Sequence, residues 1–305
     1  MSRRLKADIG LAFGTLIWGV TFVVVKDALA SASVFVFMAL RFTLAAVVMA
    51  MIFREGLGKL DRAALGAGAL TGCFLFAGHA FQTIGLQFTT PSKAAFITAL
   101  SVVIVPVTLG IFGRRRIGMW VWAGAFAALV GLYFLTVPRA GFSKLNIGDL
   151  FALACAVMFA IHIIVVGHFS RNHSVAAFSF LQVAMTALLT LVALPLFAVT
   201  GWDLPRLRWN SQLGFAIVLT AIGATAIAYS IQVWAQRFTT ATHTAIIFSL
   251  EPVFAGLTSF LLARERLGPR TLAGAALIFA GILLAELKGP TQAAAESPGP
   301  VGDSR

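Results

Sequence analysis

Charged residues are scarce in this sequence. Only 11% of its 305 residues are Asp, Glu, Lys or Arg, whereas 59% are hydrophobic; a soluble domain carries about 25% charged residues. The few charges stand in short intervals between long apolar runs. This pattern excludes an ordinary soluble domain and predicts an all-α integral membrane protein that crosses the bilayer several times.

Acidic residues are rarer still, with 11 Asp and Glu against 23 Lys and Arg, which gives a formal net charge of +12. An excess of this size can indicate nucleic-acid binding. Here, however, the basic residues form no single patch and stand in small groups at the ends of the apolar segments. We therefore interpret them as membrane topology signals and expect no nucleic-acid partner.

The motifs of enzymes and metal proteins are missing as well. Cys73 and Cys155 both lie inside apolar segments, where small packing residues are expected rather than a disulfide or a metal pair. The sequence has no glycine-rich phosphate loop, no nucleophile elbow and no zinc-binding histidine pair. We expect neither enzyme activity nor a metal or cofactor.

One stretch of the chain occurs twice. A shift of 150 positions brings Phe88-Thr89-Thr90 onto Phe238-Thr239-Thr240 and Ala123-Gly124-Ala125 onto Ala273-Gly274-Ala275. The preceding parts match with an offset of 141, which places Asp8 on Asp149. Internal repeats fix the architecture. The sequence therefore predicts two homologous halves, 1–140 and 141–288, followed by a disordered cytoplasmic tail, 289–305, rich in Pro, Gly, Ala and Ser.

Ten apolar segments each approach the roughly 20 residues that span a bilayer. They are 8–26, 33–53, 64–87, 94–112, 117–137, 147–166, 176–199, 211–234, 243–262 and 271–287. Because each half contributes an odd number of spans, the halves must enter the membrane in opposite orientations. The expected fold is two inverted five-helix repeats around a central cavity, with the binding site at their interface. Pro106 and Pro252, each inside a predicted span, are expected to bend their helices.

The distribution of Lys and Arg predicts the orientation. If the N-terminus lies inside, the first half places most of its basic residues in the cytoplasm: Arg3, Arg4, Lys6, Arg54, Lys59, Arg62 and Arg114 to Arg116. The second half leans the other way, with Arg206, Arg208, Arg264, Arg266 and Arg270 outside. The first helices usually decide, so we expect both termini in the cytoplasm.

Polar and aromatic residues recur at matching positions inside the spans. His79 and Gln82 match Tyr229 and Gln232 under the 150-residue shift, and Trp18 matches Phe159 under the 141-residue shift, as Thr21 matches His162. Polar side chains facing lipid are costly, so these should face protein or a wet cavity. The candidate substrate-binding residues are Trp18, Phe22, His79, Gln82, Phe159, His162, Tyr229, Gln232 and Phe248. Hydrogen bonding between helices is the alternative role.

Three charged residues lie within or beside the spans: Arg41, Lys93 and Glu251. Their matches in the other half are Gln182, His243 and Ser101. Each charge could bind a carboxylate or an amine, or move protons. Alternatively, the Lys93 side chain reaches the surface, and the other two hydrogen-bond neighbouring helices.

Four short stretches carry a resemblance to a known family. They are Trp18-Gly19, Arg41-Phe42, Lys93-Ala94-Ala95-Phe96, and Leu250 to Ala255 running on to Arg264-Glu265. With them the chain resembles, over residues 8–287, the EamA-type transporters of the drug/metabolite transporter superfamily, and among these the bacterial aromatic amino-acid exporters. Ser101-Val102 departs from the acidic pattern of Glu251-Pro252 in the other half.

The resemblance implies a multi-pass protein of the bacterial inner membrane that works by alternating access. It further implies that the protein is a secondary transporter exporting amino acids, aromatic ones included, and related small metabolites. The alternative function is proton-coupled efflux of multiple toxic compounds. The expected partners are small-molecule substrates and membrane lipids; a monomer fits the sequence, which leaves the oligomeric state open.

Overall fold

The computed structural model describes residues 1–57, 61–112, 117–137, 146–255, 257 and 268–288. Its helices are α1 (Arg3–Ala28), α2 (Val34–Ile52), α3 (Arg54–Leu57), α4 (Arg62–Phe88), α5 (Pro91–Ala99), α6 (Ser101–Ile111), α7 (Met119–Thr136), α8 (Ile147–Phe169), α9 (Val175–Val199), α10 (Ser211–Val218), the π-helical η1 (Leu219–Ile227), α11 (Ala228–Ala235), α12 (Ala241–Phe248) and α14 (Pro269–Lys288). Extended pairing in these ranges is limited to one isolated bridge, Ala32 with Leu207. The prediction of an all-α fold is confirmed.

In the described part of the chain, seven helical stretches are long and apolar enough to cross a membrane. They are α1, α2, α4, α5 with α6, α8, α9, and α10 through α11. Two shorter apolar helices, Met119–Phe134 and Pro269–Ala285, lie where further spans are predicted, and the segment 243–262 is described only in part. A multi-pass membrane protein is confirmed, and the number of ten spans stays a prediction.

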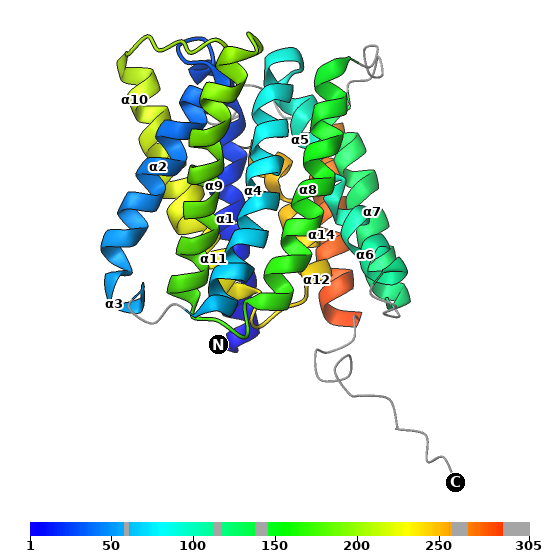
Figure 1. The fold of residues 1–305 in the computed structure, drawn as a ribbon. Coiled ribbons are helices and arrows are strands. Elements are labelled where there is room, and N and C mark those ends of the chain that lie inside the picture. The colour runs from blue at the N-terminus through cyan, green and yellow to red at the C-terminus, as the bar shows by residue number, and fades with distance from the viewer. Residues whose placement is uncertain (58–60, 113–116, 138–145, 256, 258–267, 289–305) are drawn as a thin grey trace.

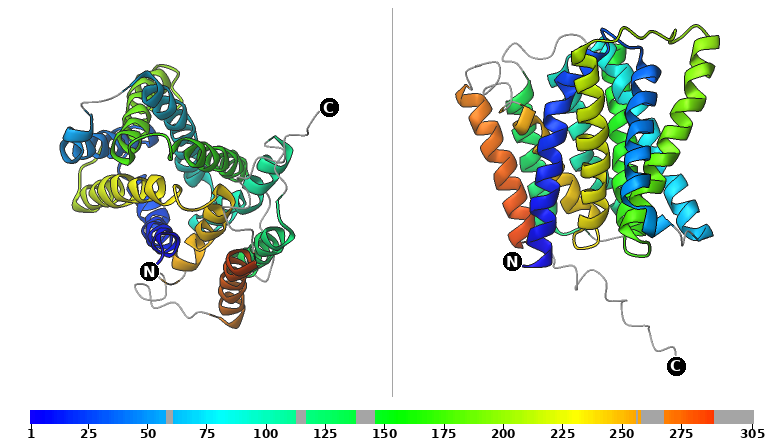
Figure 2. Two further views of the ribbon diagram at one scale, coloured as in Figure 1. Left: turned by 90° about the horizontal axis from the view of Figure 1, so that it is seen from below. Right: turned by 90° about the vertical axis from the view of Figure 1, so that its left-hand side faces the viewer.

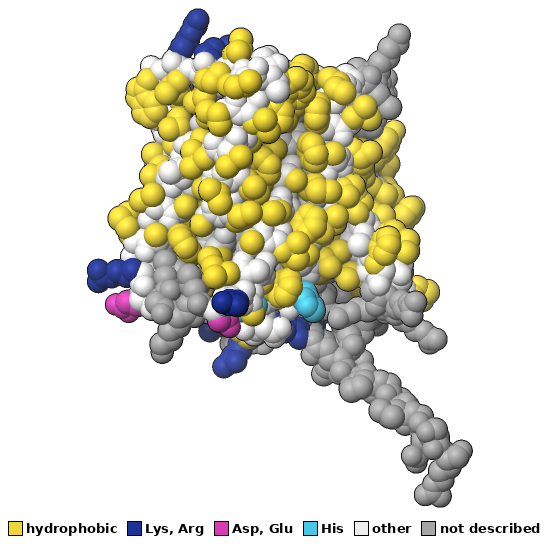
Figure 3. Space-filling view, in the orientation of Figure 1, with side chains coloured by type: hydrophobic (Ala, Val, Ile, Leu, Met, Phe, Trp, Pro, Cys, Tyr) yellow, Lys and Arg dark blue, Asp and Glu magenta, His cyan; other side chains and the backbone are white. Residues whose placement is uncertain are grey.

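The surface of the bundle is apolar over most of its height. Figure 3 shows hydrophobic side chains covering the visible face, with Lys and Arg side chains gathered toward its two ends. Large side chains such as Phe13, Val47 and Leu191 are half or more exposed along the helices. A continuous apolar band of this kind is what hydrocarbon chains would cover. The predicted basic groups at Arg114 to Arg116 and at Arg264 and Arg266, and the tail 289–305, lie outside the described residues.

The repeated Phe-Thr-Thr motif begins two equivalent helices. Thr90 Oγ1 accepts a hydrogen bond from the Lys93 N–H at the start of α5, and Thr240 Oγ1 accepts one from the His243 N–H at the start of α12. An N-cap threonine satisfies one of the backbone N–H groups that a helix start leaves unpaired. The motif is therefore repeated because both halves start this helix in the same way.

The helices α7 and α14 pack against each other through a reciprocal set of glycines. A Cβ atom at Gly124 would lie 2.6 Å from Gly281 O, and one at Gly131 would lie 2.6 Å from Gly274 O. Under the 150-residue shift Gly124 matches Gly274 and Gly131 matches Gly281, so each contact is the copy of the other. The two helices run antiparallel, and Figure 2 shows the start of α1 and the end of α14 at the same end of the molecule. Small residues permit this close approach.

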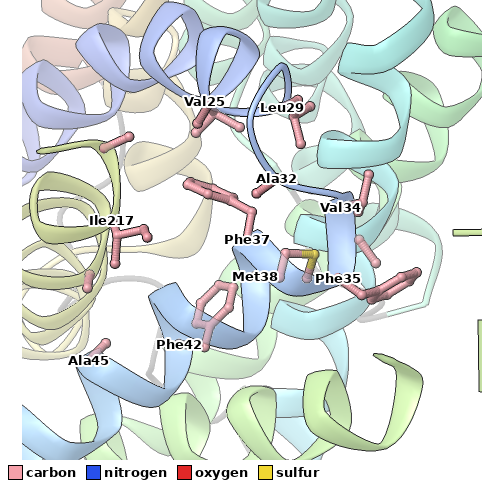
Figure 4. Close-up of a cluster of buried hydrophobic side chains, with 14 of the residues drawn as sticks. Val25, Leu29, Ala32, Val34, Phe35, Phe37, Met38, Phe42, Ala45 and Ile217 are labelled. Atoms are coloured by element: carbon pink, nitrogen blue, oxygen red, sulfur yellow. The ribbon is translucent and has the colours of Figure 1, made fainter. Parts of the chain in front are cut away.

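The remaining helices surround the interior in a way that also follows the repeat. The central helix α4 packs against α8 and α9, as Figure 1 shows, and the matching stretch η1–α11 packs against α1 and α2. A core of buried side chains gathers where α1, α2 and α10 meet (Figure 4), with Val25, Phe37 and Ile217 among them. Val25 belongs both to this core and to the lining of the cavity described below.

Two helices break at equivalent positions, not at their prolines. In the first half, the segment predicted as one span consists of two helices: α5 ends at Ala99 and α6 begins at Ser101. In the second half, α12 ends at Phe248, and residues 251–255 are helical again. Leu100 N–H donates to Ile97 O at 3.1 Å and Leu250 N–H to Ile247 O at 3.0 Å, the tight turns of a helix that ends. Pro252 lies in the first turn after the second break, where a proline is tolerated. The bend expected at Pro252 stays a prediction, because the segment that follows is described only in part.

Candidate functional site

A cavity lies at the interface of the two halves. Its empty space is about 690 Å³, the open mouth included, which is within the usual range of ligand pockets. The nine candidate substrate-binding residues all line it, together with Arg41 and Glu251. It is also lined by residues that the sequence did not single out as binding residues: Thr21, Val25, Leu86, Thr98, Ala99, Ser101 and Ile163. Both halves thus contribute walls to one chamber.

The centre of the cavity is a pair of equivalent residues in direct contact. His79 Nε2 and Tyr229 OH are 2.7 Å apart, and both side chains are buried. The aromatic rings beside this pair also match between the halves. Trp18 packs on Tyr229 with ring centroids 5.2 Å apart, and Phe159, which matches Trp18, packs on His79 with centroids 5.2 Å apart. Residues related by the repeat can touch only near its symmetry axis, so the cavity lies on that axis.

Equivalent positions hold different chemistry around this axis. His162 Nε2 lies 2.9 Å from Gln182 Oε1, while its match Thr21 donates its hydroxyl hydrogen bond to Trp18 O at 2.8 Å. The Gln232 side-chain N–H donates a hydrogen bond to Gln236 Oε1 at 3.0 Å. The buried Gln232 Oε1 accepts no hydrogen bond from the described residues. The helices around the cavity therefore match between the halves, whereas the hydrogen-bonding side chains that they carry differ.

The two helix breaks deliver residues to the cavity. Ser101 follows the first break and Glu251, its match, follows the second; both line the chamber, as does Phe248 just before the second break. Phe248 packs edge-on against Trp18, with centroids 4.9 Å apart. Gly19 accommodates this break, because a Cβ there would lie 2.7 Å from Glu251 O. Broken helices near the membrane centre are a common way to build transporter sites.

Arg41 lies at the end of the cavity formed by α2 and the π-helical turn η1. Its Nε–H donates to Thr225 Oγ1 at 3.0 Å, and its guanidinium lies 5.0 Å from the centre of the Phe42 ring. The same turn accepts a hydrogen bond from Trp18, whose Nε1–H donates to Ala224 O at 2.8 Å. A π-helical turn is rare and often marks a functional site; the sequence analysis did not predict it.

Lys93 lies outside the cavity. Its Nζ pairs with Asp149 Oδ2 at 2.6 Å, at the start of α8. The match of this pair exists at the other end of the molecule, where His243 Nε2 lies 3.2 Å from Asp8 Oδ1. Sequence reasoning noted both alignments, Lys93 with His243 and Asp8 with Asp149, without joining them into pairs. Together they are equivalent ion pairs, with the second depending on a protonated histidine.

The family of the chain follows from comparison with known proteins. The model of the EamA-like transporter family matches the chain twice, over residues 5–137 and 146–287. A relative from Archaeoglobus fulgidus, named an uncharacterized transporter, is 35% identical over 291 residues, which cover 94% of this chain and 87% of the relative. The uncharacterized transporter YoaV of Bacillus subtilis is 22% identical, covering 92% of this chain and 96% of YoaV.

A solved structure supports the fold separately. It is a crystal structure of a protein that superposes with a TM-score of 0.75 at 20% identity, covering 93% of this chain and 97% of that one. At that identity the likeness shows the fold alone. The two matches of the family model and the 35% identical relative, in contrast, establish the family: this chain belongs to the EamA-like transporter family, whose members are membrane transport proteins.

Proposed function

We propose that the protein is a secondary transporter that exports amino acids, aromatic ones included, and related small metabolites by alternating access. The observation that carries the proposal is the His79–Tyr229 contact at the centre of one cavity lined by both halves. A site on the axis of two inverted repeats can be reached from either side of the membrane when the halves exchange their conformations.

The proposed architecture is ten spans in two inverted repeats, 1–140 and 141–288, in a bacterial inner membrane with both termini in the cytoplasm. The reciprocal glycine contacts between the antiparallel helices α7 and α14 support the inversion. The start of α1 and the end of α14 lie at the same end of the bundle, which supports an even number of spans. The excess of Lys and Arg in the first half supports the orientation.

The two equivalent ion pairs are the proposed latches of the transport cycle. Lys93–Asp149 joins the starts of α5 and α8 at one end, and His243–Asp8 joins the starts of α12 and α1 at the other. Because the repeats are inverted, opening one end corresponds to closing the other. Breaking one pair while its copy stays intact would open the cavity to a single side.

The composition of the walls supports an amphipathic organic substrate. Trp18, Phe159 and Phe248 supply apolar surface, and His79, Gln82 and Gln232 supply hydrogen-bonding groups. Apolar walls with a few placed polar groups are typical of sites for small organic molecules. The export direction and the amino-acid class rest on the resemblance to the aromatic amino-acid exporters.

The direct test is flux through liposomes that contain only this protein. We expect efflux or exchange of radiolabelled phenylalanine, tyrosine or tryptophan above that of empty liposomes. An H79A variant, inserted in equal amount, should lose most of this flux. A panel of amino acids with no flux for any member would overturn the proposed substrate class.

Proton-coupled efflux of toxic compounds is the second candidate, and Glu251 favours it. Its carboxylate lines the cavity and makes no ion pair with the described residues. An acid in such a place can exchange a proton for a substrate. If this candidate is right, flux of a cationic dye should need a pH gradient, and E251Q should abolish that dependence; gradient-independent amino-acid flux in both proteins would refute it.

A further inference from the structure

Arg41 is a cation deep inside the bundle with no anion of the described residues beside it. The residue is 4% exposed and lines the cavity. One of its donors, Nε–H, bonds to Thr225 Oγ1 at 3.0 Å. Its two terminal NH₂ groups form no hydrogen bond or ion pair with the part of the chain that the structure describes. The guanidinium therefore offers its free edge to the cavity.

An unpaired cation in this position is expensive. An arginine near the centre of a membrane helix is costly to insert, because its charge is taken out of water. The Phe42 ring and the Thr225 hydroxyl stabilise the charge but do not neutralise it. A bound anion would, and the planar fork of a guanidinium matches a carboxylate with two parallel hydrogen bonds.

The fold itself does not require a cation at this site. The equivalent position in the second half is Gln182, a neutral residue that hydrogen-bonds His162 inside the same kind of helix packing. Both positions are buried, at 4% and 0% exposure. Since one half is built with an amide where the other has a guanidinium, the charge of Arg41 serves something other than the packing of α2.

The π-helical turn that holds Arg41 is also specific to one half. The matching helix of the first half, α4, is α-helical over Arg62–Phe88, whereas Leu219–Ile227 of the second half are π-helical. Thr225 lies in the turn; its hydroxyl donates to Thr220 O and accepts from Arg41.

We propose that Arg41 binds the carboxylate of the transported substrate and that Thr225 is its positioning residue. The inference rests on the proposed function, since it names how that site holds an amino acid. A single carboxylate on an apolar body fits better than a phosphate ester. Among the described residues Arg41 is the one Lys or Arg that lines the cavity, and Glu251 lines it too, so a dianion would keep uncompensated charge.

The test compares two substrates with the same ring and amine. Liposomes containing the full chain are assayed with phenylalanine and with phenethylamine, which lacks the carboxylate. We expect R41Q to raise the KM for phenylalanine at least tenfold and to leave any phenethylamine flux unchanged. R54Q removes a cation on the exposed helix α3 and should change neither. Equal losses for both substrates in R41Q would overturn the proposal.

Two further variants separate positioning from folding. T225V removes the hydroxyl and should raise the KM for phenylalanine severalfold with little change in kcat, while T225S should restore it. R41K keeps the charge without the fork and should fall between wild type and R41Q. If T225V lowers kcat for both substrates and T225S does not rescue it, Thr225 has a structural role and its assignment as positioning residue is wrong.

A binding measurement distinguishes failure of this proposal from failure of the proposed function. The thermal unfolding midpoint of the purified protein is measured with phenylpropionate, which keeps the carboxylate but lacks the amine, and with phenethylamine. Phenylpropionate should raise the midpoint of the wild type and not of R41Q. That result without any amino-acid flux would refute amino-acid export but support carboxylate binding by Arg41. Equal stabilisation by phenethylamine, or no stabilisation by phenylpropionate, would refute carboxylate binding by Arg41.

Discussion

One hydrogen bond joins His79 of the first half to Tyr229 of the second half. Tyr229→Phe would leave His79 Nε2 buried without its partner, and a buried polar atom that loses its partner costs about 1–3 kcal/mol. We expect this variant to insert normally, to unfold at a lower temperature, and to transport several times more slowly. The measurements are thermal unfolding in detergent and flux in liposomes.

The other tyrosine supplies the control. Tyr133 on α7 is 46% exposed and lies beside Arg270, away from the cavity lining. Tyr133→Phe removes the same hydroxyl and should leave flux and stability near wild type. If both variants lose flux equally, the His79–Tyr229 bond is not what the transport depends on.

At the residue scale, sequence reasoning reached the lining of the cavity through matching positions. The spacing of His79, Gln82, Tyr229 and Gln232 placed them on corresponding helix faces. It could not tell that His79 and Tyr229 touch, because that depends on how closely α4 and α11 approach the axis. For Lys93, the sequence indicated a charge inside the membrane region but not its partner. Asp149 lies 56 positions away in sequence, and only folding brings the two side chains together.

Among the helices, the α7–α14 pair offers a matched set of substitutions. Gly131→Ala would place a Cβ 2.6 Å from Gly274 O, and Gly281→Ala one 2.6 Å from Gly124 O. Both atoms belong to backbone, which cannot move aside cheaply. Overpacking of this kind costs about 1–3 kcal/mol. We expect each variant to lower the thermal unfolding midpoint, by similar amounts because the two contacts are copies.

Gly66→Ala is the control for this pair, since no atom lies within 4 Å of the added Cβ. Alanine also favours a helix over glycine by roughly 1 kcal/mol, so its midpoint should stay or rise. A drop as large as that of Gly131→Ala would show that any added methyl group destabilises the bundle, and the reciprocal packing would lose its support.

The helices themselves were largely predictable, and their irregularities were not. Apolar runs of about 20 residues predicted the positions of α1, α2, α4, α8 and α9 closely, because a bilayer demands that length. The breaks at Leu100 and Leu250 carry no proline or glycine of their own. The π-helical turn was not predictable either, because the stretch that matches it in the first half lies in α4, which is α-helical throughout.

For the whole molecule, composition and the internal repeat predicted the class and the exchange of contacts between halves, since both follow from the chain alone. They did not predict the ion pairs Lys93–Asp149 and His243–Asp8, which join helices from different halves. Figure 1 places α5 near the end of the bundle opposite the N-terminus and α12 near the end that holds it.

The last prediction tests the proposed latches, Lys93–Asp149 and His243–Asp8, by measuring access to the cavity from each side. In a background without Cys73 and Cys155, a single cysteine replaces Ala99, which lines the cavity. Removing one partner of a buried ion pair costs about 3–5 kcal/mol, enough to shift a balanced two-state equilibrium by more than tenfold. Lys93→Gln should therefore raise labelling by an impermeant thiol reagent about tenfold from the face that carries α5. Asp8→Asn should do so from the opposite face, and by less where the pH leaves His243 neutral, because that pair is then already weakened. If both variants raise labelling from the same face, the two pairs do not close opposite ends, and alternating access by exchange of the halves is wrong for this protein.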